Sequence, residues 1–296
     1  VGGSEAIDLT IRCLIQPGDE VLIVEPSFVC YRPIVSLCGG VPVVIETKEE
    51  NEFRLTADEL REKITDKTKL LVLPYPNNPT GAIMRREDLE AIAKVLKDTN
   101  IMIASDEIYS ELTYSGKHCS IAEIEGMRER TIVINGFSKS FAMTGWRLGF
   151  LGGPKEIVSQ MLKLHQYAIM SSPTVSQYAA IVAMHSCQKD IDAMRNEYNI
   201  RRRFVVDSFN KLGLKCFAPQ GAFYVFPCIK STGMTSTDFC EKLVYTKKVA
   251  VVPGDAFGEC GEGYVRVSYA YSLNHLREAI KRIGEFLEDI KNGNVQ

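Results

Sequence analysis

The sequence predicts an α/β protein in which a mainly parallel sheet carries helices on both faces, followed by a smaller α+β domain. Up to about residue 150, short runs rich in valine, isoleucine and leucine alternate with amphipathic helical stretches. Most of these runs are apolar throughout, and strands that are buried on both faces are typical of parallel sheets sandwiched by helices. After residue 153 the spacing of the apolar residues is mostly that of helices. We therefore expect a large domain at residues 1–188 and a small one, with its connecting helix, at 189–296.

The apolar runs place the strands of the large sheet at residues 20–24, 41–46, 69–74, 101–105, 131–135 and 147–151. The smaller domain is expected to hold strands at 222–226, 249–252 and 264–268. Ser4 is expected to cap a helix that runs to Ile15, and Thr56 with Glu59 predicts a capping box for a helix to about Ile64. Further helices are expected at 85–97, 155–167, 174–185, 190–212, 236–245 and 273–290.

Length and composition exclude several classes of protein. The 296 residues are 45% hydrophobic and 24% charged, and 37 acidic against 35 basic residues give a net charge of -2. This bulk charge gives no reason to expect binding to nucleic acid, and no apolar run approaches the roughly 18 residues of a membrane helix. The nine cysteines lack the spacing of metal ligands, as expected of core thiols in a reducing cytoplasm. We expect a cytoplasmic protein without a metal site.

Candidate functional residues come directly after the strands, because ligands of open parallel sheets bind beyond the carboxyl ends of the strands. The segment from Gly2 to Glu5 opens the first helix, and its free backbone N–H groups suit a phosphate, although an ordinary helix start has the same pattern. Phe28 follows the strand at 20–24 and is either a ring presented at the edge of the sheet or ordinary core.

The loop from Pro74 to Gly81 contains three prolines and two asparagines in eight residues. A cis bond before Pro79 would fix the amide of Asn78, which a flexible loop could not do. Asp106 directly follows the next apolar strand, where a carboxylate either caps a helix or pairs with a cation of a ligand.

Lys139 lies in a loop of small and apolar residues, with Arg147 eight positions further on and the only tryptophan beside that arginine. This is a poor environment for a solvated lysine and a good one for an amine held in a dry cavity. To act as a nucleophile or base near neutral pH, an amine with a pKa of about 10.4 needs that pKa lowered by about three units. Imine formation and a nearby cation such as Arg147 would supply that change.

In this order, the loops resemble the class I and II pyridoxal-phosphate-dependent aminotransferases, which have the aspartate aminotransferase fold (fold type I). The resemblance extends over essentially the whole chain, and the lysine–arginine segment is its most specific part. It rests on the motifs Gly-Gly-Ser-Glu-Ala, Asn-Asn-Pro-Thr-Gly, Ser-Asp-Glu-Ile-Tyr, Ser-Lys-Ser-Phe-Ala-Met-Thr-Gly-Trp-Arg-Leu-Gly, Gly-Ala-Phe-Tyr and Tyr-Val-Arg-Val-Ser.

The resemblance implies a role for each candidate that faces the ring of pyridoxal 5'-phosphate. Lys139 would form the aldimine and then move a proton between the substrate and the cofactor. Asp106 would pair with the pyridine nitrogen, so that the ring accepts electrons. Asn78 and Tyr109 would hydrogen-bond the phenolic oxygen, and Phe28 would stack on the ring.

The resemblance also implies sites for the phosphate and for the substrate. Arg266 would bind the α-carboxylate of the substrate as a planar fork. The phosphate would be held by Arg147 together with the helix start at Gly3, Ser4 and Glu5, and Ser138 would add a hydroxyl. The amino group would then pass from an L-amino acid to a 2-oxo acid.

Relatives in this family carry a segment before the Gly-Gly-Ser-Glu motif, and their sheets are of a seven-stranded type. We therefore expect the chain to be a fragment that begins after most of the first strand, binds the cofactor and is impaired in turnover. The resemblance also implies a homodimer with a composite active site. A carbon–sulfur β-lyase of the same fold, or the cofactor-sensing domain of a transcriptional regulator, remain alternatives.

Overall fold

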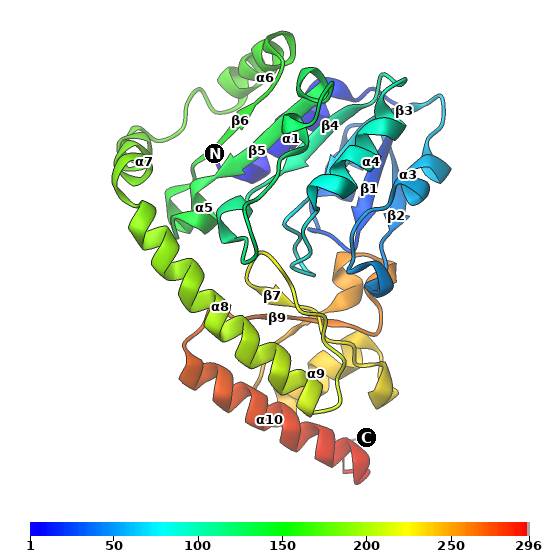
Figure 1. Ribbon diagram of the computed structural model, residues 1–296, viewed down its shortest axis with the longest axis vertical. Helices are drawn as coiled ribbons and strands as arrows, with labels where there is room; N and C mark the ends of the chain where they lie inside the picture. Colours follow the sequence, from blue (N-terminus) through cyan, green and yellow to red (C-terminus); the bar gives the residue numbers. More distant parts are fainter. Residues whose placement is uncertain (295–296) are drawn as a thin grey trace.

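The computed structural model describes residues 1–294, which form a large and a small sheet with their helices (Figure 1). The large sheet has six strands in the order β2-β1-β3-β4-β5-β6. The first five strands pair in parallel, and β6 pairs antiparallel with β5. The strands are β1 (Glu20–Glu25), β2 (Val41–Glu46), β3 (Thr68–Leu73), β4 (Met102–Asp106), β5 (Thr131–Gly136) and β6 (Gly149–Gly152).

The predicted α/β class and all strands of the large sheet are confirmed, with ends that differ by at most about two residues. Within residues 1–294 the large sheet has six strands, and the seven-stranded type that the resemblance implies included a first strand expected to be mostly missing. Val1 and Gly2 precede the first helix without forming a strand.

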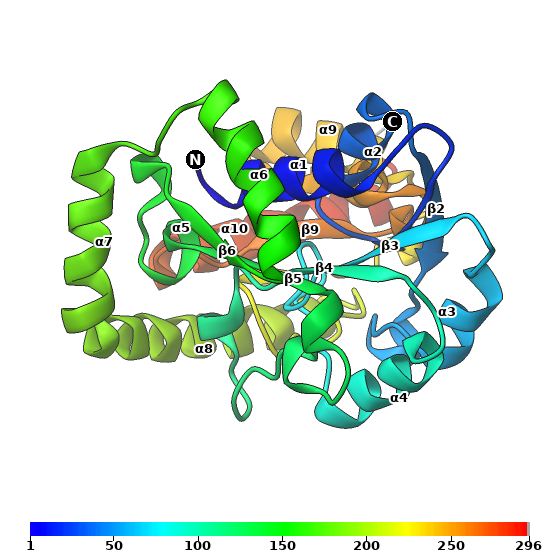
Figure 2. The same ribbon diagram turned by 90° about the horizontal axis from the view of Figure 1, so that it is seen from above.

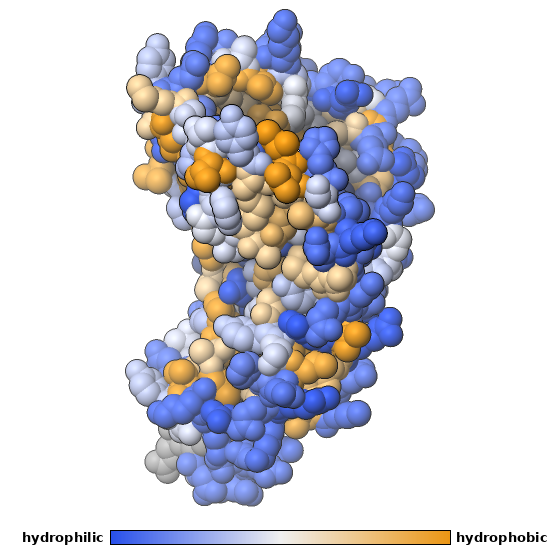
Figure 3. All heavy atoms as spheres, turned by 90° about the vertical axis from the view of Figure 1, so that its left-hand side faces the viewer, coloured by the Kyte–Doolittle hydropathy of each residue, from blue (hydrophilic) through white to orange (hydrophobic). Residues whose placement is uncertain are grey.

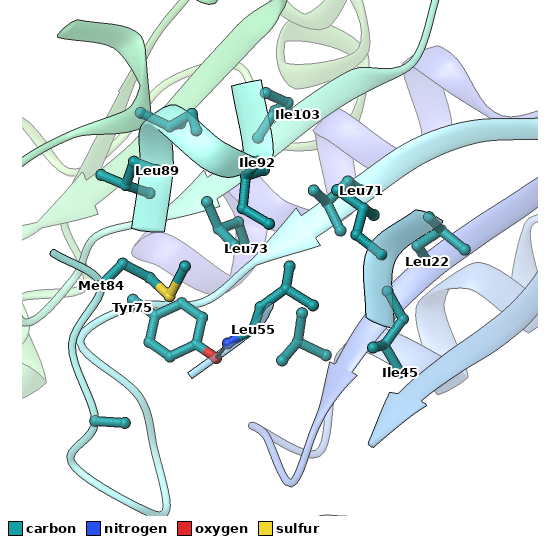
Figure 4. Packing of buried hydrophobic residues seen from close by; sticks show 14 of the residues in the cluster. Leu22, Ile45, Leu55, Leu71, Leu73, Tyr75, Met84, Leu89, Ile92 and Ile103 are labelled. Carbon is teal, nitrogen blue, oxygen red and sulfur yellow. Dashed lines mark hydrogen bonds between the residues drawn. The ribbon is translucent and has the colours of Figure 1, made fainter. Parts of the chain in front are cut away.

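Helices cover both faces of the large sheet (Figure 2). One face carries α1 (Gly3–Leu14), α2 (Tyr31–Leu37) and α6 (Lys155–Ala168), and the other carries α3 (Ala57–Lys63) and α4 (Arg86–Leu96). Alternate side chains of one strand therefore enter different cores: Val21 and Ile23 pack beneath α1 and α2, whereas Leu22 packs beneath α3 and α4. Figure 4 shows this second core, where Leu22 lies with residues of β2, β3 and α4.

One local expectation for the helices of this domain was wrong, and one helix was missed. Ser4 does not cap α1, because the helix begins at Gly3, two residues earlier than a Ser4 cap would place it. Gly2 occupies the cap position, with a φ of 84° that favours glycine. The helix α2 was not predicted, because it has only seven residues and contains Pro33. The capping box of Thr56 and Glu59 at the start of α3 is confirmed.

The small sheet has the strand order β7-β9-β8 and packs against helices that follow the large sheet in sequence. The strand expected at residues 249–252 lies later in the chain, because β8 begins only at Val252. The short α5 (Phe137–Ser140) joins β5 to the segment before β6. The remaining elements are α7 (Thr174–Ser186), α8 (Gln188–Lys211), β7 (Tyr224–Val225), α9 (Ser236–Lys247), β8 (Val252–Pro253), β9 (Val265–Ser268) and α10 (Leu273–Lys291).

The helices α8 and α10 lie side by side and form a separate core with α9 and the small sheet (Figure 1). The boundary at residues 188 and 189 stays a prediction. No helix within residues 1–294 combines the length and the apolar character that a membrane crossing requires.

Candidate active site

A pocket of about 230 Å³ lies where the carboxyl ends of β1, β3, β4 and β5 meet the start of α1 and the small sheet. It brings together every site residue expected from the sequence except Glu5. The side chain of Glu5 instead accepts a 2.7 Å hydrogen bond from Nδ1 of His165 and lines a different hollow. The pocket is lined by Gly3, Ser4, Ile7, Phe28, Tyr31, Pro74, Pro76, Asn78, Asp106, Ile108, Tyr109, Ser138, Lys139, Thr144, Arg147, Tyr224 and Arg266.

Asp106 ends β4 and presents a buried carboxylate to the pocket. Its Oδ2 accepts a 2.7 Å hydrogen bond from the hydroxyl of Tyr31, and its Oδ1 accepts a 3.2 Å bond from the backbone N–H of Ile108. Burial raises the pKa of Asp106, and the nearby carboxylate of Glu107 adds to this, while the two hydrogen bonds and Lys139 oppose it. A ligand cation at this position would replace the solvation that the carboxylate has lost.

Lys139 lies in α5 and is half-buried, with Nζ 5.8 Å from the ring centre of Phe223 and 6.0 Å from that of Tyr109. Burial lowers the pKa of this amine, the positive charges of Arg266 and Arg147 lower it further, and Asp106 opposes them. Lys139 forms no salt bridge with another residue in the range 1–294. A larger share of the amine is therefore uncharged near neutral pH, as a nucleophile requires.

Arg266 on β9 directs its guanidinium towards the same pocket. Its Nη1 donates a 3.0 Å hydrogen bond to Oδ1 of Asn78, so the amide hydrogens of Asn78 remain as donors. Its Nε is buried and has no hydrogen-bond partner among the described residues. A partly buried guanidinium with an unused donor and no paired carboxylate suits a planar anion.

The opposite end of the pocket suits a phosphate. The first backbone N–H groups of α1, including those of Gly3 and Ser4, have no acceptor within the helix. Gly2 approaches Arg147 so closely that a Cβ on Gly2 would lie 2.7 Å from Nη2 of that arginine. Arg147 itself has a positive φ of 50°, and its Nη1 donates to the carbonyl of Thr144 at 2.8 Å. A helix start and an arginine therefore face one small space.

The structure adds two tyrosines to which the sequence had given no role. Tyr31 lies on α2 and binds Asp106, and Tyr224 lies on β7 with its hydroxyl 3.1 Å from that of Tyr109. Neither could have been found from spacing along the chain, because each reaches a residue on a different sheet or helix. The Gly-Ala-Phe-Tyr motif was the one available signal for Tyr224.

The predicted cis bond between Asn78 and Pro79 is present, as are cis bonds before Pro26 and Pro76. Phe28 and Ser138 both line the pocket and are partly buried. Within residues 1–294 no group of three histidine, cysteine or acidic side chains is arranged to hold a metal ion. The groups that line the pocket are an amine, a buried carboxylate, two guanidinium groups that form no salt bridge within residues 1–294, and a helix start, and together they fit pyridoxal 5'-phosphate.

Known proteins that are similar to this chain are aminotransferases. The family model described as aminotransferase class I and II matches residues 1–283. A putative aminotransferase of Bacillus subtilis, YugH, is 48% identical over 287 residues, which are 97% of this chain and 74% of the relative. The aspartate aminotransferase of Pyrococcus abyssi is 47% identical over 294 residues, covering 98% of this chain and 76% of the relative. The aromatic aminotransferase of Pyrococcus horikoshii has a crystal structure that matches with a TM-score of 0.96 at 46% identity, covering 98% of this chain and 79% of that one.

Proposed function

This chain belongs to the class I and II aminotransferases, and on that premise we propose that it uses pyridoxal 5'-phosphate bound beside Lys139 to transfer amino groups between L-amino acids and 2-oxo acids. One observation carries the proposal: Lys139, Asp106 and Arg266 line the same pocket. An amine, a buried carboxylate and an unpaired guanidinium are the groups needed to bind a carbonyl, a ring nitrogen and a substrate carboxylate. The relatives described above are aminotransferases, and we therefore set aside the lyase and the regulator.

The cofactor, when bound, supplies a carbonyl that reacts with amines and a ring that accepts electrons from the α-carbon of the substrate. Lys139 would hold it covalently through Nζ, and its lowered pKa favours the uncharged amine that this bond requires. If a substrate amine took its place, the freed Nζ of Lys139 would be positioned to accept a proton from the α-carbon of the substrate and to hold it within the pocket.

Asp106 would hold the proton on the ring nitrogen of the cofactor. Its carboxylate is buried and already accepts hydrogen bonds from Tyr31 and from the backbone of Ile108. These donors fix the direction of the carboxylate and favour its ionised form, against burial, which raises its pKa. A positive ring nitrogen opposite Asp106 would be strongly stabilised in this water-poor environment.

Arg147 and the start of α1 would hold the phosphate, and the amide of Asn78 with the hydroxyl of Tyr109 would bind the phenolic oxygen. Phe28 would pack against the ring face, and Ser138 and the backbone N–H of Glu5 would complete the phosphate site. Arg266 would bind the substrate carboxylate, with its free Nε as one of the donors.

We also propose that the protein is a homodimer that forms through the face made by β6, α6 and α7. Large apolar side chains gather on this face, which Figure 3 shows towards the viewer. Exposed apolar patches of this kind usually mark protein interfaces. The exposed side chains of this face include Phe150, Leu162, Tyr167, Met170, Val175, Tyr178, Ile181, Val182 and Met184.

A panel of L-amino acids, each offered with 2-oxoglutarate, tests the proposed function. We would include aspartate and aromatic amino acids, because relatives with these names share nearly half of the residues of this chain. The proposal predicts a new amino acid from 2-oxoglutarate with at least one donor, and none with Lys139→Ala. Product formation that is equal in Lys139→Ala would contradict it.

We propose a cytoplasmic location as well, since all nine cysteines are free thiols.

A further inference from the structure

Tyr224 is a buried residue of the small sheet that reaches into a pocket built mainly by the large sheet. Its hydroxyl lies 3.1 Å from the hydroxyl of Tyr109, and the two rings meet edge to face with centres 5.9 Å apart. On its other side, the guanidinium carbon of Arg266 lies 4.6 Å from the centre of the Tyr224 ring. One side chain thus contacts two residues to which the proposed function gives separate tasks.

We propose that Tyr224 is a positioning residue for amino transfer, which orients the hydroxyl of Tyr109 with its own hydroxyl and the guanidinium of Arg266 with its ring. The inference rests on the proposed function, because it assigns Tyr109 to the cofactor and Arg266 to the substrate. It goes further by connecting the two binding events through one residue.

The hydroxyl contact determines which way the proton of Tyr109 points. Each tyrosine has one proton to donate, so either hydroxyl can be the donor of their shared hydrogen bond. An acceptor oxygen in the pocket would draw the proton of Tyr109 towards itself, and the proton of Tyr224 would then be donated to Tyr109. Hydrogen bonds in such a chain strengthen one another, so the donation from Tyr109 becomes stronger.

The ring contact limits the orientation of Arg266. The guanidinium carbon lies 4.6 Å from the centre of Tyr224 and 4.8 Å from that of Phe257, and Nη1 is bound to Asn78. Two aromatic faces and one hydrogen bond leave a planar group little freedom. The N–H groups of Arg266 that do not bind Asn78 are therefore fixed in an orientation in which they can bind a carboxylate.

The backbone before Tyr224 is held in an unusual conformation, which fixes the start of β7. Ala222 has a φ of 56°, a region that L-residues rarely adopt. Its carbonyl oxygen accepts hydrogen bonds from the hydroxyls of Tyr114 and Tyr269, the latter at 3.1 Å. Gly221 packs so tightly that a Cβ there would lie 2.6 Å from Cβ of Pro76. These contacts fix the direction from which Tyr224 enters the pocket.

Two substitutions separate the hydroxyl from the ring. Tyr224→Phe removes only the hydroxyl, and Tyr224→Leu also removes the aromatic face beneath Arg266. Tyr198→Phe is the matched control, because the Tyr198 ring packs against Phe223, with centres 5.6 Å apart, while its hydroxyl has no hydrogen-bond partner within residues 1–294. All three variants are compared with the wild-type protein loaded with pyridoxal phosphate.

The first measurement is the pH midpoint at which the visible absorption band of the loaded protein changes. A donor on the phenolic oxygen draws negative charge from it, which makes the neighbouring proton on Nζ of Lys139 easier to lose. Without the Tyr224 hydroxyl the hydrogen bond that Tyr109 donates is weaker, so the midpoint should rise by about half a pH unit. A shift of this size corresponds to part of the free energy of one hydrogen bond. The ionisable groups that act on the two hydroxyls are Asp106, Arg266, Tyr31 and Tyr198. Those that act on the amine of Lys139 are Arg266, Arg147 and Asp106.

The second measurement separates KM from kcat. Tyr224→Phe keeps the ring and should leave the KM of the amino donor close to wild type while lowering kcat. Tyr224→Leu should raise that KM about tenfold, the scale of one partly buried cation–π contact. Tyr198→Phe should match the wild type in midpoint, KM and kcat.

The outcomes distinguish this inference from the proposed function. A wild-type protein without a visible band would contradict both. A wild-type band whose midpoint is unchanged in Tyr224→Phe would overturn the inference alone. An equal shift in Tyr198→Phe would also overturn it, because the effect would then come from general changes in packing.

Discussion

The hydroxyl of Tyr31 donates a 2.7 Å hydrogen bond to Oδ2 of Asp106, and both side chains are buried. This bond lowers the pKa of Asp106, against the larger opposite effect of burial. The protonation state of Asp106, at the end of β4, therefore depends in part on a residue of α2. The predictions below follow from this dependence and from the charges around the pocket.

The first prediction concerns Tyr31→Phe in the cofactor-free protein. Removing the donor leaves a buried carboxylate with one fewer hydrogen bond, so the free energy of unfolding at pH 7 should fall by about 1–3 kcal/mol. Because the folded pKa of Asp106 is already raised and would rise further, the cost exists only where Asp106 is ionised. The difference between variant and wild type should shrink as the pH falls through the raised folded pKa of Asp106 in the two proteins, because the unfolded state is the same in both. Urea denaturation at several pH values measures it, and a difference that is independent of pH would contradict this account.

The second prediction is that Asp106→Asn has opposite effects on stability and on cofactor binding. Asparagine has the same shape but no charge, so the cofactor-free protein should be at least as stable as the wild type, since burial disfavours the charged form. The affinity for pyridoxal phosphate should fall at least about tenfold, because a hydrogen bond to a charged group contributes about 1.5–3 kcal/mol. Urea denaturation and a cofactor titration measure the two effects. Unchanged affinity would remove Asp106 from the cofactor site.

The third prediction concerns the phosphate site at Arg147. Arg147→Gln should weaken the binding of pyridoxal phosphate by about tenfold or more, because a charge-assisted bond is replaced by a neutral one. Pyridoxal, which lacks the phosphate, should lose much less affinity than pyridoxal phosphate, because only the effect of Arg147 on the pKa of Lys139 would then be lost. Parallel titrations with the two compounds make the comparison, and an equal loss for both would place Arg147 elsewhere.

The fourth prediction tests the proposed dimer. Val182 on α7 is 61% exposed, and Val182→Glu would place a charge within the apolar face. The variant should sediment as a monomer at concentrations at which the wild type is a dimer, because burying an unpaired charge is costly. Tyr245→Glu on α9, an exposed position of the small domain, is the matched control and should leave the dimer intact. A wild type that is monomeric at micromolar concentration would refute the proposal.

Much of the fold could be predicted because apolar runs of the large sheet are buried on both faces, as in β1 and β3. The exceptions have local causes. The α2 helix is too short for a periodic signal, and β8 consists of two residues at the end of an apolar run that is otherwise not strand. Ser4 has a side chain typical of a helix cap, but the tight approach of Gly2 to Arg147 shifts the start of α1.

The candidate site was predictable where its residues follow strands, as Asp106 and Lys139 do. Tyr31 and Tyr224 were missed, because their importance comes from contacts with residues far away in sequence. The side chain of Glu5 was expected among the cofactor residues, yet it points to His165. The sequence indicates that a helix start lies at the phosphate site, but not which way each side chain of that helix points.

The central claim is that Lys139 binds the cofactor covalently, and a spectrum tests it most directly. Pyridoxal phosphate added to the purified protein should produce a visible absorption band distinct from that of the free cofactor, and borohydride should fix the cofactor to the peptide that contains Lys139. Lys139→Ala should give neither the band nor the labelled peptide, whereas Lys163→Ala, at an exposed lysine of α6, should give both. A band and a labelled peptide that persist in Lys139→Ala would contradict the account.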